Sequence, residues 1–361
     1  MDGYSLPPIH MKQLLSSLLI LIFFQLGCGN KESTGVWKDV TNVDLKGTVF
    51  ETDDLTLPVR IVVSKANNLM AIINRGGMMV SLYKLSDGAH VKSFGRQGDG
   101  PGEFLNVGNV QFLEGGKVAV LGTAKKKFSM YSLSSLYEDE NPMPFKTINL
   151  GSGNITQPQF LGKDLIADTR FNYDPDSIGR LNFFNTEGKN IKVTGSYPET
   201  NVEMSPVHLT QSYNSFWDND EASKRIVLSH TYTDMIEVYD TEGSLINRVS
   251  GPDYFAPNLG ERKVGEGSMF APIKGSKVGY FANRVGPKGI LALYSGEPFA
   301  SFSDRITELI HFDLDGQPKT RFQLDLPVFH FDVDWQSQTI YALSMEVNQD
   351  GREFAVLTYD F

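Results

Sequence analysis

The sequence predicts an all-β fold, a six-bladed β-propeller with four-stranded antiparallel blades. Three observations support this prediction: a strand-and-turn phrase that recurs along the chain, the spacing of its copies, and two strand-like runs before each copy. Periods of about 40 to 50 residues with about four strands each are typical of propeller blades. A hydrophobic content of 40% and 34 glycines suit a fold with a large core and many turns.

The phrase is clearest between Ile236 and Pro252, where the sequence reads IEVYDTEGSLINRVSGP. An alternating apolar run leads into a Glu242-Gly243 turn, and a second alternating run follows. Alternation has the period of a strand, and glycine supplies the positive φ that a tight turn needs, so the phrase predicts a β-hairpin. Further copies begin at Val80, Phe128, Leu181, Leu309 and, shortened, at Phe354.

An aromatic residue near the end of the first strand of each copy gives the spacing. These residues are Tyr83, Tyr131, Phe184, Tyr239, Phe312 and Tyr359. They are separated by 48, 53, 55, 73 and 47 residues. No repeat closes on a Trp-Asp dipeptide, which argues against the WD40 type of propeller.

Two more strands are predicted before each copy, which gives four strands in each of the six blades. In chain order they are Val59–Val63 and Leu69–Ile73, Val107–Leu113 and Lys117–Leu121, Pro158–Leu161 and Asp164–Asp168, Tyr213–Trp217 and Arg225–Ser229, Val278–Ala282 and Ile290–Tyr294, and Val328–Val333 and Thr339–Leu343. The long fourth interval contains Gly251–Pro272 and Gly296–Asp304, which are rich in Gly, Pro, Ser and Asn. We predict that both are loops and not an extra domain.

The last blade has only three strands at the C-terminus, because the chain stops at Phe361. A fourth is available near the other end, in the apolar-rich stretch Lys38–Phe50. We predict that this stretch closes the ring as the outer strand of the last blade, because a closed ring leaves no seam between the first and last blades. The alternative is a disordered linker.

The N-terminus has the features of a targeting segment. Lys12 precedes an almost wholly apolar stretch, Leu14–Phe24, of about a dozen residues, which is short for a membrane span but suits a signal peptide. Cys28, the only cysteine, follows Gly27, and this junction resembles a bacterial lipobox. The resemblance implies cleavage before Cys28 and its acylation, so residues 1–27 would be a lipoprotein signal peptide, 28–37 a tether and 38–361 the propeller. The alternative is an ordinary signal peptide or membrane anchor with an incidental cysteine.

The stretch FGRQGDGPGEF, Phe94–Phe104, is the most distinctive in the chain. Its glycines permit turns that other residues resist, and it lacks the Gly-Lys-Ser/Thr ending of a phosphate loop, so we predict a shaped crossing between blades. This phrase, the lipobox-like start and the Tyr-Asp-x-x-Gly hairpins resemble the six-bladed TolB-like propeller lipoproteins of Bacteroidota, the BF3164-like group. The resemblance implies a six-bladed propeller and carries over no catalytic residues. We expect a protein of the cell envelope with a lipid anchor in the outer membrane, either periplasmic or exposed at the surface.

Composition limits the functions that the chain can perform. With 43 acidic and 33 basic residues the net charge is −10, which disfavours nucleic-acid binding because phosphates require a basic face. The six histidines show no metal-ligand spacing, and no catalytic motif with the right structural context occurs. No cofactor is expected. Asp332 and Asp334, on the expected inner strand of the last blade, are candidates for the central channel or for a solvent-facing strand.

In a propeller, the connections between the second and third strands of each blade emerge on the same face as the crossings between blades. Function on repeat scaffolds tends to use such loops. The candidate ligand-binding residues there are Arg75, Arg170, Tyr173, His230, Tyr232 and Arg284. We expect a non-enzymatic binding module for a protein, peptide or glycan. The alternatives are a solvated face without a ligand and a metal-dependent hydrolase or lyase of the lactonase kind, which needs Asp, Glu, Asn and His around a metal.

Overall fold

The computed structural model describes residues 35–53, 55–151, 155–169, 179–200, 203–265, 267–303, 305–348 and 351–361. The chain divides into two compact units, Met1–Lys38 and Asp39–Phe361. The described part of the first unit contains a short 3₁₀ helix, η1 (Gly35–Trp37). Across the described ranges, no helix has the length and apolar character needed to cross a bilayer. The expected signal peptide, Cys28 and most of the tether lie outside these ranges.

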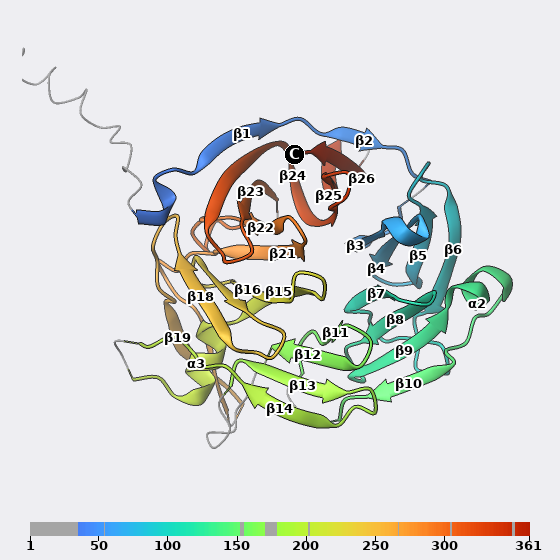
Figure 1. The fold of residues 1–361 in the computed structure, drawn as a ribbon, viewed down its shortest axis with the longest axis horizontal. Helices are drawn as coiled ribbons and strands as arrows, with labels where there is room; N and C mark the ends of the chain where they lie inside the picture. The colour runs from blue at the N-terminus through green and yellow to red at the C-terminus, as the bar shows by residue number, and fades with distance from the viewer. Residues whose placement is uncertain are drawn as a thin grey trace, which may run out of the picture. The chain divides into compact units, whose positions relative to one another are not determined.

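The second unit is a ring of β-sheet blades, as predicted, and Figure 1 shows them arranged around a common axis. Each of the first four blades is a four-stranded antiparallel sheet in chain order from the axis outward. Blade 1 has β3 (Pro58–Ser64), β4 (Leu69–Asn74), β5 (Met78–Lys84) and β6 (His90–Arg96). Blade 2 has β7 (Asn109–Leu113), β8 (Lys117–Gly122), β9 (Lys127–Ser132) and β10 (Lys146–Asn149). Blade 3 has β11 (Gln159–Leu161), β12 (Leu165–Thr169), β13 (Leu181–Asn185) and β14 (Asn190–Thr194), and blade 4 has β15 (Ser215–Asp220), β16 (Arg225–His230), β17 (Met235–Tyr239) and β18 (Leu245–Ser250).

The fifth and sixth blades share one long strand. Blade 5 consists of β21 (Tyr280–Gly286), β22 (Gly289–Tyr294), β23 (Ile306–Phe312) and the first part of β24 (Pro318–Asp334). The second part of β24, from Val328, pairs with β25 (Thr339–Asn348), which pairs with β26 (Gly351–Asp360), so that it forms the inner strand of blade 6. The predicted first and second strands of all six blades are confirmed, with ends shifted by one to a few residues.

The predicted ring closure is confirmed in position and corrected in detail. The stretch expected as one outer strand, Lys38–Phe50, forms two strands, β1 (Thr41–Leu45) and β2 (Thr48–Phe50). Only β2 closes blade 6, antiparallel to β26, whereas β1 pairs in parallel with β24 as an additional outer strand of blade 5. The two are separated at Gly47, whose N–H donates to the Asp325 carboxylate at 2.9 Å. The stretch therefore joins the two blades instead of belonging to one.

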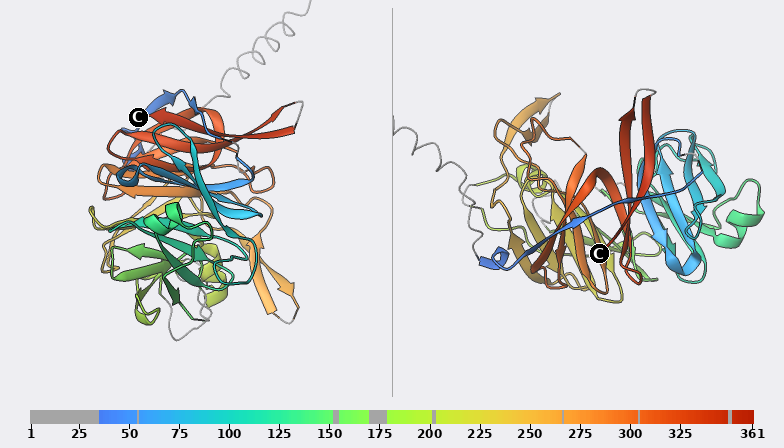
Figure 2. Two further views of the ribbon diagram at one scale, coloured as in Figure 1. Left: turned by 90° about the vertical axis from the view of Figure 1, so that its right-hand side faces the viewer. Right: turned by 90° about the horizontal axis from the view of Figure 1, so that it is seen from above.

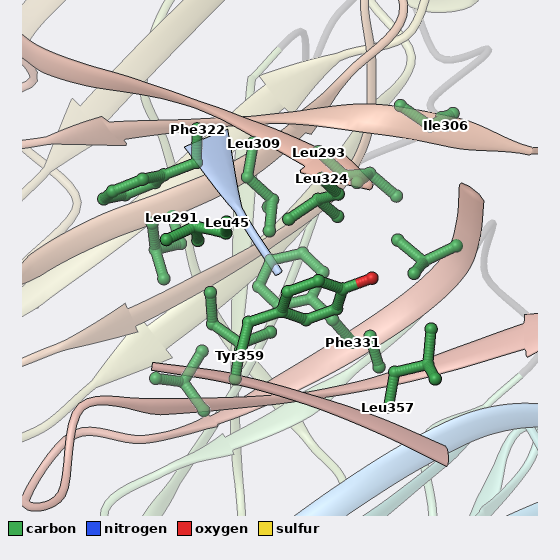
Figure 3. Packing of buried hydrophobic residues seen from close by; sticks show 14 of the residues in the cluster. Leu45, Leu291, Leu293, Ile306, Leu309, Phe322, Leu324, Phe331, Leu357 and Tyr359 are labelled. Carbon is green, nitrogen blue, oxygen red and sulfur yellow. The ribbon is translucent and has the colours of Figure 1, made fainter. Parts of the chain in front are cut away.

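Hydrophobic side chains fill the spaces within and between the blades. The cluster in Figure 3 joins blades 5 and 6 and includes Leu45 from β1, Phe331 from β24 and Tyr359 from β26. Another joins blades 6 and 1, with Tyr341, Val356 and Ile61 buried and Phe50 of β2 packed against it. The closing segment thus contributes apolar side chains to both clusters, which stabilises the ring through burial as well as through strand pairing.

Substitution of Gly47 tests this closure. A Cβ atom added there would lie 2.8 Å from Cζ of Tyr359, a buried ring that the surrounding core holds in place. We expect Gly47→Val to displace the closing segment and to lower the free energy of unfolding by about 1–3 kcal/mol, measured by urea titration. Gly267→Val is the matched control, because among the described residues its added Cβ would meet nothing closer than 3.8 Å. Equal stability of the two variants would contradict the role given to this segment.

Two connections between blades contain structure that the sequence did not lead us to expect. The segment Gly251–Pro272, predicted as a loop, contains a hairpin of β19 (Leu259–Val264) and β20 (Gly267–Pro272), so that prediction is wrong in part. Helix α3 (Pro206–Ser212) lies against β20, where the rings of His208 and Phe270 stack with centroids 4.0 Å apart. A second short helix, α2 (Leu133–Glu138), follows β9. Figure 2 shows the β19–β20 and β25–β26 hairpins projecting from the same side of the ring.

The crossing Phe94–Phe104 has the predicted structural role. Phe94 and Phe104 are both buried in the cluster between blades 1 and 2. The N–H of Phe104 donates to the Arg96 carbonyl at 3.0 Å, and the N–H of Gly98 donates to the Phe104 carbonyl at 3.1 Å. The Glu103 carboxylate accepts the N–H of Gly100 at 2.8 Å. The loop is therefore held by its own hydrogen bonds, and the strand β7 follows it.

Candidate ligand-binding site

The innermost strands of all six blades enclose a cavity of about 260 Å³ in the central channel of the ring. These strands are β3, β7, β11, β15, β21 and the second part of β24. Each contributes at least one polar side chain, and the wall of the cavity is more polar than apolar. We consider one such residue from each blade: Arg60, Gln111, Gln159, Asp218, Arg284 and Asp332.

Five of these six side chains hold the ring together by bonding to the innermost strand of the next blade. Gln111 accepts the Phe160 N–H at 2.7 Å, and Gln159 donates to the Trp217 carbonyl at 2.8 Å. Asp218 accepts the N–H of Val285 at 2.8 Å. Blade 5 is joined to blade 6 by the ion pair between Arg284 Nε and Asp332 Oδ1, at 2.7 Å. Blade 6 is joined to blade 1 by the N–H of Val63, which donates to Asp332 Oδ2 at 2.6 Å.

Arg60 is the exception among the six. Its guanidinium lines the cavity but has neither a hydrogen bond nor an ion pair within the described ranges. Burial and the nearby Arg284 cation lower the pKa of Arg60 to about 10, so it remains charged at neutral pH. An uncompensated cation in a partly desolvated cavity is unfavourable, and a bound anion would relieve this cost.

His330 lies between the two arginines and is neutral. Its Nδ1 accepts the N–H of Ile61 at 3.3 Å, and its Nε2 lies 3.4 Å from the Arg284 guanidinium. Burial, followed by the charges of Arg284 and Arg60, lowers the pKa of His330 well below its usual value. The histidine therefore adds a polar surface to the cavity without adding a charge at neutral pH.

The acidic side chains of the channel only partly balance the two arginines. Asp332 is engaged by Arg284. Burial raises the pKa of Asp218 to about 7, against the opposing effect of Arg284, so near neutral pH this carboxyl is ionised in only part of the molecules. The cavity therefore carries excess positive charge on a protein whose net charge is −10.

A second cavity of about 390 Å³ adjoins the channel on the face where the second-to-third strand connections emerge. Arg60, Phe216 and His330 line both cavities, so the second forms the mouth of the first. Four phenylalanines contribute to its wall: Phe216, Phe281, Phe329 and Phe354. The rings of Phe216 and Phe281 lie 5.3 Å apart between centroids. The mouth also includes the exposed Arg75, so it combines aromatic surface with a second cation.

The structure brings together two of the six predicted ligand-binding residues. Arg75 lies at the channel mouth, and Arg284 lies inside the channel on β21 and not on a loop as expected. Tyr232 is half-buried beside Phe299, with ring centroids 6.5 Å apart, and lines neither cavity. Arg170 and Tyr173 lie outside the described residues.

His230, the remaining candidate, is fully buried at the joint between blades 3 and 4. Its Nε2 lies 3.1 Å from Glu237 Oε2, and the same carboxylate pairs with Arg180 at 2.9 Å and Arg248 at 2.6 Å. Arg180 also donates to the Tyr213 carbonyl and lies over the Tyr197 ring. His230 is therefore part of a buried ionic cluster and does not reach the loop surface.

Sequence reasoning missed Arg60, Asp218, His330 and the four phenylalanines of the mouth. A signal for the channel was present in two blades, whose first strands place one polar or charged residue between apolar ones: Arg60 in PVRIVVS and Gln111 in NVQFL. Asp332 was correctly considered as a channel residue. Asp334 instead caps the following turn, where it accepts the N–H of Gln336 at 3.0 Å.

Two solved structures from Bacteroides are similar to this chain, and the first of them supports the fold. A member of the DUF4221 family from Bacteroides vulgatus superposes with a TM-score of 0.55 at 11% identity, covering 88% of this chain and 98% of that one. A putative exported protein from Bacteroides fragilis gives a TM-score of 0.49 at 10% identity, covering 89% and 98%. The search of curated proteins found no match.

The family model described as "TolB-like 6-blade propeller-like" matches residues 37–336, which is most of the chain. This match agrees with the six blades of the described structure and with the fold that the sequence predicts. The chain therefore belongs to the family of TolB-like six-bladed propellers.

Proposed function

We propose that the protein is a non-enzymatic binding propeller of the cell envelope, which holds an anionic group of a protein, peptide or glycan partner at the mouth of its central channel. The observation that carries this proposal concerns Arg60. Among the six channel side chains named above, one from each blade, it is the one without a hydrogen bond or an ion pair to the described residues. The other five are engaged in contacts between neighbouring blades and are part of the scaffold.

The chemistry of the two cavities supports a partner with an anionic end and an apolar part. Arginine presents a planar fork of donors that matches carboxylate and phosphate groups. The phenylalanines of the mouth offer flat apolar surfaces for a side chain or for the apolar face of a sugar ring. Arg75, at the rim, would add long-range attraction for the same anion.

The proposed location rests on the N-terminal sequence. A signal-peptide-like stretch before Cys28 favours export followed by acylation of that cysteine. Two or more acyl chains would hold the protein stably at a membrane. Mass spectrometry of the mature N-terminus would detect this acylation. A mature protein that retains residues 1–27 would contradict the anchor without affecting the binding proposal.

The lactonase-like alternative receives no support from the described residues. Such an enzyme needs several carboxylate, amide and imidazole ligands around one metal ion. Within the ranges that the structure describes, no three His, Cys, Asp or Glu side chains are placed to hold a metal. A chelator that lowered the melting temperature would revive this alternative.

Replacement of Arg60 tests the binding proposal. Calorimetric titrations with inorganic phosphate, galacturonic acid and a short peptide with a free C-terminal carboxylate would identify the preferred anion. Because a hydrogen-bonded charge contributes about 1.5–3 kcal/mol, we expect Arg60→Met to weaken binding of that probe by about 10- to 100-fold. Arg96→Met, on the outer strand of the same blade, is the control and should bind as the wild type does. Equal binding by the Arg60 variant would exclude the channel as the anion site.

A further inference from the structure

The mouth of the channel combines apolar side chains with cations. Leu57 and Met345 extend the apolar surface of its four phenylalanines. Among the described residues that line it, Arg60, Arg75 and His330 are the polar ones, and none is a carboxylate. A sugar ring carries several hydroxyl groups, which lose free energy when they are buried without partners. This wall offers few partners for hydroxyl groups, so it suits a ligand whose anion is attached to an apolar group.

His330 provides a second hydrogen-bond donor beside Arg60. Its Nδ1 accepts the N–H of Ile61 at 3.3 Å, so the neutral ring carries its hydrogen on Nε2. The Arg284 guanidinium lies 3.4 Å from Nε2, but it is itself a donor and cannot accept this hydrogen. Arg60 and His330 both line the channel and its mouth. One charged and one neutral donor are therefore available where the two cavities meet, which suits the two oxygens of a carboxylate.

The carboxyl groups of the channel limit the charge of the ligand. Asp218 and Asp332 both line the channel cavity, and Asp332 forms an ion pair with Arg284 at 2.7 Å. A second negative charge on the ligand would be repelled by these groups. Arg75 offers only weak compensation, because it is exposed and its charge is screened by solvent. The channel therefore favours a monoanion over a doubly charged phosphate.

The size and enclosure of the channel favour the end of a chain. Its volume of about 260 Å³ lies below the range of about 300–1,000 Å³ that is usual for pockets of drug-sized ligands. The innermost strands of all six blades surround it. A chain end enters such a space as a single strand, whereas an acidic side chain within a chain requires the chain to enter and to leave again. At a C-terminus, moreover, the carboxylate and the side chain share one Cα atom.

We propose that the channel binds the free C-terminal carboxylate of a partner polypeptide whose last residue is apolar, such as phenylalanine or leucine. This inference rests on the proposed function, because it names the anion for the same site. Arg60 and His330 Nε2–H donate to the two carboxylate oxygens. The terminal side chain packs against the phenylalanines of the mouth, among them Phe329 and Phe354, whose ring centroids lie 6.3 Å apart.

The test uses the purified protein and four hexapeptides of glycine and serine, compared by isothermal titration calorimetry. The first ends in phenylalanine with a free carboxylate, the second has the same sequence with a C-terminal amide, and the third ends in serine with a free carboxylate. The fourth is the second with an internal glutamate. We expect the first to bind most tightly, the second and fourth about 10- to 100-fold more weakly, and the third at least about tenfold more weakly.

Variants of the chain assign the two parts of the ligand. Arg60→Met should abolish the difference between the free acid and the amide. Phe354→Ala should weaken the phenylalanine-ended peptide several-fold and leave the serine-ended peptide unchanged, which also shows that the site remains folded. Phe145→Ala is the control, because Phe145 is 58% exposed and lines neither cavity.

Two results would overturn the proposal: equal binding of the free acid and the amide, or equal binding of the phenylalanine-ended and serine-ended peptides. Inorganic phosphate and galacturonic acid then separate it from the proposed function. Binding of either probe that depends on Arg60 would leave the proposed function in place without this inference. If no probe binds in a way that depends on Arg60, both are wrong.

Discussion

Replacement of Glu237 by glutamine is expected to remove about 3–5 kcal/mol from the free energy of unfolding, because it leaves buried cations without their counter-charge. Glu237 is fully buried on β17, and one of its oxygens accepts from both Arg180 and His230. Its other oxygen accepts from Arg248 Nε at 2.6 Å. Arg180 is only 1% exposed and has no access to water as a substitute partner. Urea unfolding of the wild type and the variant would measure the loss.

The matched control for Glu237→Gln is Asp315→Asn. Asp315 also pairs with an arginine, Arg225, at 3.1 Å, but its side chain is 65% exposed. Exposed ion pairs contribute about 1 kcal/mol or less, so this variant should be nearly as stable as the wild type. Similar losses for the two variants would show that burial of the cluster has no special effect. A second variant, Arg180→Met in the Glu237→Gln background, should recover part of the loss because it removes the orphaned cation.

The same cluster makes a prediction about acid. The charges of Arg180 and the bond from His230, which outweigh burial, hold the pKa of Glu237 well below its ordinary value of 4.5. A carboxyl whose pKa is lower in the folded state stabilises the fold fully above its unfolded pKa and loses this contribution as the pH falls toward its folded pKa. The difference in the free energy of unfolding between the wild type and Glu237→Gln should therefore be largest near neutral pH and should decrease below pH 4.5.

The blades could be predicted because their signals are local. The strand β4 was expected at Leu69–Ile73 and lies at Leu69–Asn74, since an apolar run bounded by turn residues contains the information. The hairpin β19–β20 was missed for the opposite reason. Most of its residues are exposed, so neither face requires alternation, and its glycines resemble those of a loop. The alternation of apolar and polar residues in a strand reflects the burial of one face, and a projecting hairpin buries few of its side chains.

Contacts between distant segments set the limit of the sequence-based predictions. The parallel pairing of β1 with β24 joins Thr41 to Thr320, and no local pattern marks one of these segments as the partner of the other. His230 follows the predicted strand Arg225–Ser229 and was expected on the loop face, but it is the last residue of β16, and Glu237 and Arg180 enclose it from two blades. Arg284 was chosen as a loop residue and lies in the channel. For both side chains, the contacts that decide their position come in part from a neighbouring blade, which the local sequence does not show.

The wall of the channel depends on a buried carboxylate that the sequence did not single out. Asp168 on β12 is fully buried. Its Oδ2 accepts the N–H of Thr156 at 2.8 Å, and its Oδ1 accepts the N–H of Gln157 at 2.9 Å. The Gln157 carbonyl in turn accepts Nε1–H of Trp217 in blade 4 at 3.0 Å. Asp168 therefore positions a segment that braces blade 3 against blade 4 beside the channel.

Asp168→Ala should lower the free energy of unfolding by about 3 kcal/mol or more. The substitution leaves the Thr156 and Gln157 amides without their acceptor, and each buried donor left unpaired costs about 1–3 kcal/mol, whereas the Thr156 hydroxyl can still donate to the Thr169 carbonyl. Asp164→Ala, on the exposed turn that precedes the same strand, is the control and should change stability by less than about 0.5 kcal/mol. Hydrogen exchange at Thr156 and Gln157 should accelerate in the first variant alone. Since Gln157 and Trp217 line the channel, weaker anion binding should accompany this loss of stability. Unchanged anion binding in a destabilised variant would show that the contact between blades 3 and 4 does not contribute to the binding site.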